Sequence, residues 1–297
     1  MSSVDLPVSL SAKSVGASAR AVQAHYDVSN EFYALWLDPS MTYSCALWDQ
    51  GDTLEQAQNR KLDFHLTQAQ AHRKRNLLDV GCGWGALLEK AVVAFDVEKA
   101  TGLTLSQAQV DWVNARKRNN VDVRLEGWEG HRPHEPYDAI VSIGAFEHFA
   151  RVGLTRPEKH RAYRRFFEWC HANSTMDCDI SLQSILYENY DEREPNPFVG
   201  EVFPESELPR LSEIIAACEG LFEIVDLRND REHYARTLRC WFANLRSRRE
   251  EVLAIVGDEV FRKYEKYLGV FAVGFHTGTV NLTRIHARKI PDPVACA

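Results

Sequence analysis

Residues 76–95, NLLDVGCGWGALLEKAVVAF, decide the fold of this chain. The apolar run Asn76–Val80 predicts a buried strand, and Ala86–Phe95 has the pattern of a helix. The glycine cluster Gly81–Gly85 between them leaves bare backbone at the carboxyl end of the strand, where doubly wound sheets bind ligands. Glycines also form plain strand-to-helix turns. The acidic Asp79 before the cluster and the unpaired N–H groups of the following helix favour a nucleotide site.

The same alternation of strand and helix continues downstream. Short apolar runs predict strands at Ala100–Leu103, Val121–Leu125 and Tyr137–Ile143. Helical patterns lie between and after them, at Ser106–Asn119 and Glu158–His171. Strands that alternate with helices are joined by crossovers, which predicts a parallel sheet with helices on both faces.

Both ends of the chain carry further elements. A leader that we expect to be flexible to about residue 20 precedes an aromatic helix at His25–Asp38 and a polar helix at Thr53–Ala71. After the predicted sheet region, we expect strands at Asp179–Leu186 and Phe222–Leu227, helices at Glu207–Cys218, Tyr234–Val256 and Asp258–Leu268, and a closing edge strand at Thr279–Arg288.

The composition is that of a soluble globular protein, with 297 residues of which 45% are hydrophobic and 26% charged. A chain of this size can close one large core without disulfide or metal staples. The net charge of −7 argues against nucleic acid and anionic lipid, because binding to both relies on clustered Lys and Arg. The 7 cysteines are scattered and form no C-x-x-C pair, so we expect reduced thiols, no metal and a cytoplasmic protein.

The end of the second predicted strand bears on which nucleotide is bound. The glycine cluster also matches the G-x-G-x-x-G/A fingerprint of dinucleotide sites. Such sites need a carboxylate at the end of the second strand to hold a ribose hydroxyl, but here the strand runs into GLTLS at 102–106. Neutral groups such as Thr104 and Gln109 are left to hold the ribose, which argues against an NAD-dependent oxidoreductase.

Motifs along almost the whole chain resemble one family, the cyclopropane fatty acid synthase-like S-adenosylmethionine-dependent methyltransferases, which include the mycolic acid cyclopropane synthases. Each motif is weak alone, but together and in order they are highly specific. They are HYDVSNEFYALWLDP (His25–Pro39), TYSCALW (Thr42–Trp48), LLDVGCGWG (Leu77–Gly85), GLTLSQAQ (Gly102–Gln109), GWE (Gly127–Glu129), SIGAFEHF (Ser142–Phe149), EVFPESELP (Glu201–Pro209) and HYARTL (His233–Leu238).

The resemblance implies a class I methyltransferase Rossmann-like fold. This fold is α/β, with a mostly parallel seven-stranded sheet, helices on both faces and an added helical cover. We expect a single methyltransferase domain over residues 21–297. Within it, 21–75 would form the N-terminal helical cover, 76–183 the cofactor-binding core, and 184–297 the substrate lid with the C-terminal helices and strands.

The resemblance also implies S-adenosylmethionine as the cofactor and a set of residues that bind it. An indole can stack on the adenine, and a carboxylate can accept from its exocyclic amine. For Trp128 the alternative is core packing. The implied residues are Tyr43 and Ser44 over the methionine part, Asp79, Gly81, Gly83 and Gly85 at its carboxylate and amino end, Thr104 and Gln109 at the ribose, Trp128 and Glu129 at the adenine, together with Leu105 and Ile143.

In the same family a bicarbonate ion lies beside the transferable methyl group and serves as the base. The matched positions are Cys45, Ile143, Glu147 and Tyr234. Methyl transfer to an alkene produces a cation that must lose a proton to a positioned base, which gives a methylated alkene or a cyclopropane. A buried Glu147 would orient the anion or act as the base itself. The alternative is a structural carboxylate at a helix N-terminus.

Three departures from the family pattern bear on the reaction. The family usually has a histidine at the position of Gln183, the fourth candidate catalytic residue, and cyclopropane synthases have a cysteine where this chain has Phe271 or a neighbour. Because an amide lacks the charge of histidine, we expect weak anion binding, little stimulation by bicarbonate and a product that keeps its double bond. The segment Tyr187–Phe203 is shorter and more acidic than the apolar lid over fatty acyl chains, which favours a short acceptor.

These arguments predict an S-adenosylmethionine-dependent C-methyltransferase that acts on an unsaturated small molecule in bacterial secondary metabolism. The alternatives are a cyclopropane synthase on an acyl chain, a small-molecule N-methyltransferase, and a cofactor-binding subunit without activity. We expect an acceptor that is free, carrier-bound or a prenyl diphosphate, no nucleic acid and no membrane insertion, and we leave a homo-oligomer open. The basic cluster Arg156–Arg165 favours a solvated helix face, with a carrier protein or diphosphate as the alternative partner.

Overall fold

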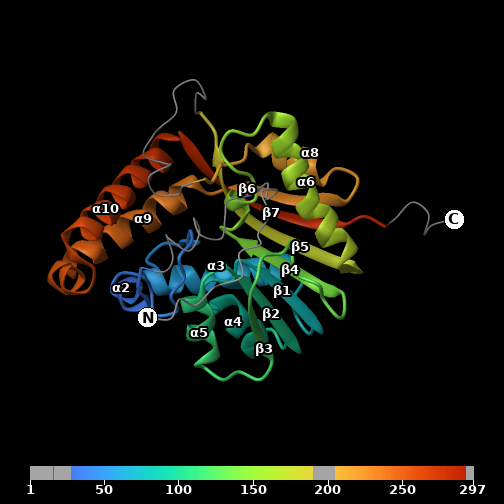
Figure 1. The fold of residues 1–297 in the computed structure, drawn as a ribbon, viewed down its shortest axis with the longest axis horizontal. Coiled ribbons are helices and arrows are strands. Elements are labelled where there is room, and N and C mark those ends of the chain that lie inside the picture. Colours follow the sequence, from blue (N-terminus) through green and yellow to red (C-terminus); the bar gives the residue numbers. More distant parts are fainter. Residues whose placement is uncertain (1–15, 17–27, 190–204, 292–297) are drawn as a thin grey trace, which may run out of the picture.

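The computed structural model describes residues 16, 28–189 and 205–291, which form one mixed seven-stranded sheet with helices around it (Figure 1). The strands are β1 (Asn76–Val80), β2 (Lys99–Thr104), β3 (Val121–Leu125), β4 (Tyr137–Ile143), β5 (Ser174–Tyr187), β6 (Phe222–Asn229) and β7 (Val280–Lys289). Their order in the sheet is β3-β2-β1-β4-β5-β7-β6. Strands β1 to β5 pair in parallel, and β7 is antiparallel to both of its neighbours. The predicted mostly parallel sheet is confirmed.

The position of β7 corrects one prediction. The sequence predicted a closing edge strand at Thr279–Arg288, but β7 pairs with β5 on one side and β6 on the other, and the edge is β6. The alternation of polar and apolar residues in β7 suggested an edge strand with one face in water. In fact, the polar residues Thr283 and Arg284 are as fully buried as the apolar residues on either side of them. Polar residues at those positions face other polar groups inside the protein, where an edge strand would face water.

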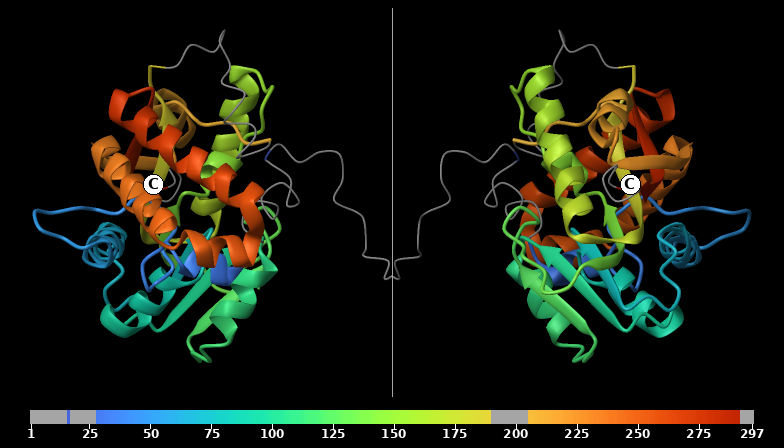
Figure 2. Two further views of the ribbon diagram at one scale, coloured as in Figure 1. Left: turned by 90° about the vertical axis from the view of Figure 1, so that its left-hand side faces the viewer. Right: turned by 90° about the vertical axis from the view of Figure 1, so that its right-hand side faces the viewer.

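Helices cover both faces of the sheet (Figure 2). They are α3 (Leu54–Gln68), α4 (Ala86–Ala94) and α5 (Gln107–Asn114) on one face, and α6 (Arg156–Ala172) and α8 (Leu211–Cys218) on the other. Leu66 and Leu88 belong to the apolar core of the first face, and Phe166 and Ile214 to that of the second. Burial of these two apolar layers fixes the strands between the helices.

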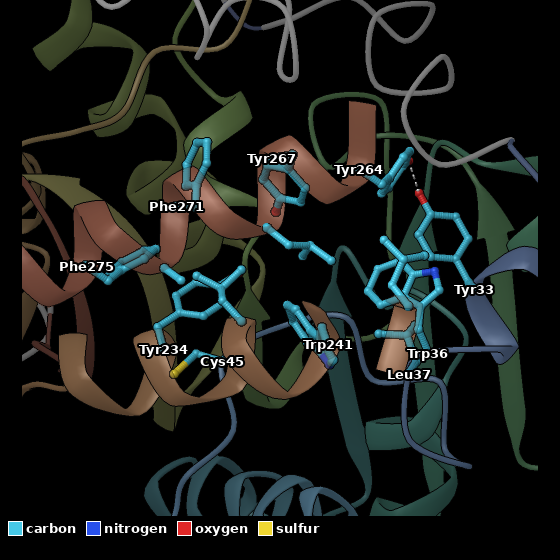
Figure 3. Packing of buried hydrophobic residues seen from close by; sticks show 14 of the residues in the cluster. Tyr33, Trp36, Leu37, Cys45, Tyr234, Trp241, Tyr264, Tyr267, Phe271 and Phe275 are labelled. Atoms are coloured by element: carbon cyan, nitrogen blue, oxygen red, sulfur yellow. Dashed lines mark hydrogen bonds between the residues drawn. The ribbon is translucent and has the colours of Figure 1, made fainter. Parts of the chain in front are cut away.

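An added helical cover stands at one end of the sheet and consists of α2 (Asn30–Ala34), α9 (Arg231–Ser247) and α10 (Arg249–Thr277). Aromatic side chains join these helices (Figure 3). The rings of Trp36 and Trp241 meet edge to face with centroids 5.8 Å apart, and the hydroxyls of Tyr33 and Tyr264 share a hydrogen bond of 2.8 Å. The added helical cover that the resemblance implied is present, and its aromatic side chains form a core of their own.

Helix boundaries in the cover differ from the predictions. The predicted helix 234–256 is interrupted at Arg248, where α9 has ended and α10 begins. Helix α10 then continues through a kink at Gly257, whose φ of 77° favours glycine. Of the predicted helix 25–38, the described part forms only the short α2, which starts after Ser29 because the Ser29 hydroxyl accepts a hydrogen bond from the backbone of the first turn.

Replacing Trp241 by alanine tests the cover as a core. Trp241 is fully buried, so the Trp241→Ala variant should lose about 3–5 kcal/mol of unfolding free energy. The measurement is urea denaturation followed by circular dichroism. The control is Val273→Ala on α10, where the side chain is 61% exposed, and its change should stay within about 0.5 kcal/mol. Equal losses of unfolding free energy in Trp241→Ala and Val273→Ala would contradict the assignment of the cover as a packed core.

Candidate active site

A cavity of about 220 Å³ opens at the carboxyl ends of β1, β2 and β4. Its walls include the glycine loop after β1, Thr104 at the end of β2 and Ile143 at the end of β4. Gly16 also lines it, and a Cβ at this position would lie 2.7 Å from the backbone oxygen of His148. Gly16 is the one described residue of the leader that we expected to be flexible, and it belongs to the cavity wall. The cavity thus lies where the topology of a parallel sheet predicts a ligand site.

The glycine loop needs glycine for two different reasons. Gly81 has a φ of 85°, and a Cβ there would lie 2.5 Å from the Cβ of Ala145. Gly85 has a φ of 82°, caps α4, and approaches Val113 of α5 so closely that a Cβ would lie 2.8 Å from it. Gly83, with a φ of 53°, stands in open space on the cavity wall. Gly81 and Gly83 line the cavity, whereas Gly85 acts through the packing of two helices.

Two buried ionisable side chains, Lys61 and Asp79, line this cavity. The ammonium of Lys61 donates to the hydroxyl of Ser44 over 2.8 Å. Burial lowers the pKa of Lys61 to about 7 and raises the pKa of Asp79 to about 7. Oδ1 of Asp79 has no hydrogen-bond partner among the residues that the structure describes. A zwitterionic amino acid, such as the methionine part of S-adenosylmethionine, carries charges that suit both side chains.

Lys61 was missed by the sequence analysis, although a signal existed. Residues Ala57, Lys61 and His65 follow one another at a spacing of four on α3, and all three are buried. This spacing places them on one face of the helix, in line with Leu62 and Leu66. The helix looked polar overall, so the polar residues on its apolar face were not singled out.

The predicted ribose and adenine ligands line another part of the same cavity. Thr104 and Gln109 are buried, and the Thr104 hydroxyl donates to Oε1 of Gln109 over 2.6 Å. Trp128 lines the cavity and also packs in the core beneath α6, so core packing does not remove its ring from the cavity wall. The carboxylate of Glu129 lies on the wall and forms an ion pair of 3.1 Å with Arg165.

With one exception, every predicted cofactor-binding residue lines this cavity, and the exception is Gly85. The glycine cradle, the unpartnered Asp79 oxygen and the neutral ribose ligands fit S-adenosylmethionine. The lining residues include Tyr43, Ser44, Asp79, Gly81, Gly83, Thr104, Leu105, Gln109, Trp128, Glu129 and Ile143.

A second, smaller cavity adjoins the first and shares Tyr43, Ser44, Gly144 and His148 with it. Figure 3 shows the side of this cavity that α9 and α10 provide, with Tyr234, Tyr267 and Phe271 labelled. Three of the four predicted catalytic residues meet here. The other lining residues are Glu147, Gln183, Ile185, Ser206, Leu208, Tyr234, Tyr267, Phe271 and Leu282.

Glu147 belongs to the short 3-10 helix η1 (Phe146–His148) that follows β4. Its Oε1 accepts a hydrogen bond of 2.7 Å from the backbone N–H of Ile185, and its Oε2 has no partner within the described part of the chain. Burial raises the pKa of Glu147 to about 7. At neutral pH this carboxyl group can therefore either accept or donate a proton, as a general acid or base requires.

Cys45, the fourth predicted catalytic residue, is buried but lines neither of these two cavities. Its thiol contacts the backbone oxygen of Ala46 at 3.2 Å, and burial raises the pKa of the thiol to about 11. The thiol is thus protonated at neutral pH. Its backbone oxygen accepts a hydrogen bond of 3.1 Å from Arg284. The structure places this residue behind the wall of the second cavity.

Gln183 stands beside a buried positive charge that the sequence analysis missed. Nε of Arg284 donates to Oε1 of Gln183 over 3.0 Å, and Nε2 of His65 lies 3.2 Å from the same oxygen. The expectation of weak anion binding considered only the neutral amide of Gln183. The buried guanidinium of Arg284 places a positive charge directly beside that amide. No local signal pointed to this contact, because the two residues are 101 positions apart.

Two members of the basic cluster Arg156–Arg165 form ion pairs with other parts of the protein. Lys159 forms an ion pair of 3.5 Å with Glu207, and Arg165 pairs with Glu129. These contacts favour a structural role over a diphosphate or carrier-protein site. The acidic segment 187–203 lies mostly outside the described residues. Within those residues no cluster of His, Cys, Asp and Glu is suited to a metal, and no helix is long and apolar enough to cross a membrane.

Comparison with known proteins identifies close relatives. The family model described as mycolic acid cyclopropane synthetase matches residues 13–285. Cyclopropane mycolic acid synthase 1 of Mycobacterium tuberculosis is 36% identical over 289 residues, which cover 90% of this chain and 96% of that protein. Hydroxymycolate synthase MmaA4 of the same organism is 37% identical over 267 residues, which cover 83% and 85%. The crystal structure of mycolic acid cyclopropane synthase CmaA1 complexed with SAH and CTAB has 34% identity and a TM-score of 0.83, and covers 92% of this chain and 99% of that chain.

The cofactor site predicts a thermal shift. At 100 times its dissociation constant, S-adenosylmethionine should add roughly 2.7 kcal/mol to the stability and raise the melting temperature, whereas NAD should not. Gly83→Val, whose side chain enters the cavity, should abolish the shift. The control is Gly51→Val, since Gly51 has a similar positive φ of 83° in open space away from the cavity. A shift with NAD alone would reject the cofactor assignment.

Glu147 predicts a pH-dependent difference in stability. Its pKa of about 7 in the folded protein exceeds the ordinary value of 4.5, so its contribution to stability is complete below pH 4.5 and is lost as the pH rises through 7. The unfolding free energy of wild type minus that of Glu147→Gln should therefore fall over this range. Urea denaturation of the ligand-free proteins measures it. The control is Glu223→Gln, which changes an exposed carboxylate. A flat difference for Glu147→Gln would mean that its pKa is ordinary.

Proposed function

The chain belongs to the mycolic acid cyclopropane synthetase family and is an S-adenosylmethionine-dependent methyltransferase, and we propose that its methyl acceptor is a double bond in an acyl chain, which it converts to a cyclopropane. Mycolic acids, named in its relatives, are long-chain acyl compounds. This proposal differs from our expectation of a small-molecule acceptor and takes up the acyl-chain alternative, which the relatives favour.

One observation carries the proposal: a carboxylate oxygen without a partner in an otherwise mainly apolar cavity beside the cofactor site. Ile185, Leu208, Phe271 and Leu282 provide apolar surface, and Glu147 provides the open oxygen. Apolar walls suit a hydrocarbon chain, because burial of its methylene groups away from water is favourable. A buried acid-base group in such a wall suits a reaction that must remove one proton from carbon.

The chain's residues have separate tasks in this reaction. S-adenosylmethionine, when bound, supplies a methyl group that its sulfonium makes electrophilic. Tyr43 and Ser44, which line both cavities, lie where the double bond must approach this methyl group. The π electrons of the alkene form the new C–C bond as the S–C bond breaks, which leaves a positive charge on the acyl chain. Loss of a proton from the transferred carbon closes the ring, and the ionised carboxylate of Glu147 accepts that proton.

The residues also fit bicarbonate as the base. Oε2 of Glu147 and the amide of Gln183 face the same cavity, so one wall offers an acid-base carboxyl group and a neutral donor. Bicarbonate, when bound, supplies a proton acceptor beside the methyl group. Glu147 in its protonated form, which its raised pKa allows, can donate to an anionic oxygen.

Product analysis tests the proposal. The protein is incubated with 13C-methyl-labelled S-adenosylmethionine and vesicles of a cis-monounsaturated phospholipid, and the extracted lipid is studied by proton and carbon NMR. We expect upfield ring-methylene signals and loss of the alkene signal. Label in a new methyl group with the alkene retained would keep the acyl acceptor and reject ring closure. Lipid without label, while S-adenosylmethionine still binds, would reject the acyl acceptor.

The same assay tests Glu147. Glu147→Gln should lower turnover by about two to four orders of magnitude, the range for a lost acid-base group, with the affinity for S-adenosylmethionine nearly unchanged. The control is Glu223→Gln, which changes an exposed carboxylate and should keep wild-type turnover. Turnover near wild type in Glu147→Gln would assign this carboxylate a structural role.

A further inference from the structure

The size of the second cavity limits what it can hold. Its volume is about 50 Å³, against about 220 Å³ for the first cavity. A water-sized group needs about 10–15 Å³ of such space, so the second cavity holds roughly three to five groups of the size of a methylene. Tyr43 and Ser44 line both cavities. An acyl chain whose double bond lies beside them can therefore place only a few carbons in the second cavity.

The aromatic wall that α10 gives this cavity is held in place by neighbouring rings. Phe271 and Tyr267 are 6% and 3% exposed, and their rings meet edge to face with centroids 5.0 Å apart. Tyr267 also shares a side-chain hydrogen bond with Tyr43. One turn further along α10, Phe275 packs on Tyr234 with ring centroids 4.5 Å apart (Figure 3). Because protein interiors are close-packed, these rings cannot move aside for additional methylene groups without a cost in free energy.

The chemistry of an acyl chain decides which of its ends can enter the second cavity. The carboxyl end is joined to a headgroup or a carrier, which is polar and far larger than this cavity. The methyl end is a narrow hydrocarbon and suits the apolar surface of Ile185, Leu208 and Leu282. The part of the chain beyond the double bond is therefore the part that enters, and the walls of the cavity limit the number of its carbons.

Among the described residues that line this cavity, Phe271 is the one aromatic residue whose side chain has no polar atom. Its ring occupies space and has no hydrogen-bonding task. We propose that Phe271 is a specificity-determining residue, whose ring restricts the acceptor to acyl chains with at most about five carbons beyond the double bond. This inference rests on the proposed function, because it specifies the acyl chain that accepts the methyl group. Removal of the ring takes six carbon atoms out of the wall and leaves their space to the acceptor.

A competition among acyl chains tests this limit. The vesicles contain three phosphatidylcholines in equal amounts, each with a cis double bond at the same distance from the carboxyl group and with four, six or eight carbons beyond it. After incubation with 13C-methyl-labelled S-adenosylmethionine, mass spectrometry measures the label in each chain. One methylene too many for an apolar pocket costs about tenfold or more in kcat/KM. We therefore expect the chain with four carbons to be labelled roughly tenfold or more above the chain with eight.

The same competition tests Phe271 itself. In Phe271→Ala, the labelling of the chains with four and eight carbons should become equal to within about twofold. Phe271→Leu removes less of the side chain and should shift the ratio in the same direction by a smaller factor, which keeps the test valid if the alanine variant does not fold. The matched control is Val270→Ala on the same helix, where the side chain is 40% exposed, and it should keep the wild-type ratio. A ratio within one sample does not depend on the overall activity of the variant.

A second measurement needs no methyl transfer. Binding of linear alkanols from propanol to octanol is followed through the methyl NMR signal of Ile185, which lines the cavity, in the presence of S-adenosylhomocysteine. Each methylene that fits should increase the affinity about fourfold. In the wild type this increase should stop at about five carbons, whereas in Phe271→Ala and Phe271→Leu it should continue to longer alkanols.

The outcomes separate this proposal from the proposed function. Equal labelling of the three chains by the wild type, an unchanged ratio in both Phe271 variants, or a wild-type affinity that rises up to octanol overturns the role of Phe271. Equal changes in Phe271→Ala and Val270→Ala also overturn it, because they would reflect a general disturbance of α10. A protein that labels none of the three chains, but whose alkanol series stops early in the wild type and extends in the Phe271 variants, would lose the acyl acceptor and retain Phe271 as the limit of its apolar pocket.

Discussion

The buried ion pair between Arg284 and Asp230 holds the candidate site together. Asp230 stands at the start of α9, where its backbone N–H donates to Leu282 of β7 over 2.8 Å and its backbone oxygen accepts from Tyr234. The helix that carries Tyr234 is thereby fixed to the strand that carries Arg284. Removing one partner of such a pair leaves an uncompensated buried charge, which costs several kcal/mol. The wall of the second cavity therefore depends on a contact that lies behind it.

Burial also sets the chemistry of the groups that face the two cavities. It raises the pKa of Asp79 and of Glu147 to about 7 and lowers the pKa of Lys61 to about 7. The cause is the same in each case, because a poorly solvated site disfavours the charged form. Three side chains that are ordinarily charged at neutral pH can thus gain or lose protons there. These pKa shifts cost folding free energy, and the packing of the rest of the protein supplies it by keeping the three polar groups buried.

Family membership identifies the cofactor and the reaction class, whereas the residues that line the second cavity bear on the product. Membership establishes the cofactor and the class of reaction, and all but one of the predicted cofactor-binding residues line the first cavity. The resemblance predicts departures from the family pattern at Gln183 and at Phe271 or a neighbour, and both of these named residues line the second cavity. At the first position, Nε of Arg284 donates to the amide oxygen of Gln183, and Nε2 of His65 lies 3.2 Å from the same oxygen. Whether the product is a cyclopropane or a methylated alkene depends on which proton the residues of this cavity remove from the cation.

The sequence by itself determined the strands beside the glycine loop, and its family resemblance pointed to many of the residues that line the first cavity. Strands β1, β3 and β4 have the predicted bounds, because apolar runs and turn residues act over a few positions, and parallel strands bring their carboxyl ends to one edge. The tertiary structure alone decided that β7 lies between β5 and β6, and that Arg284 meets Gln183 and Asp230. Strand neighbours and partners of buried charges come from segments far apart in the chain. Their identity depends on how the whole core packs, and no local pattern contains it.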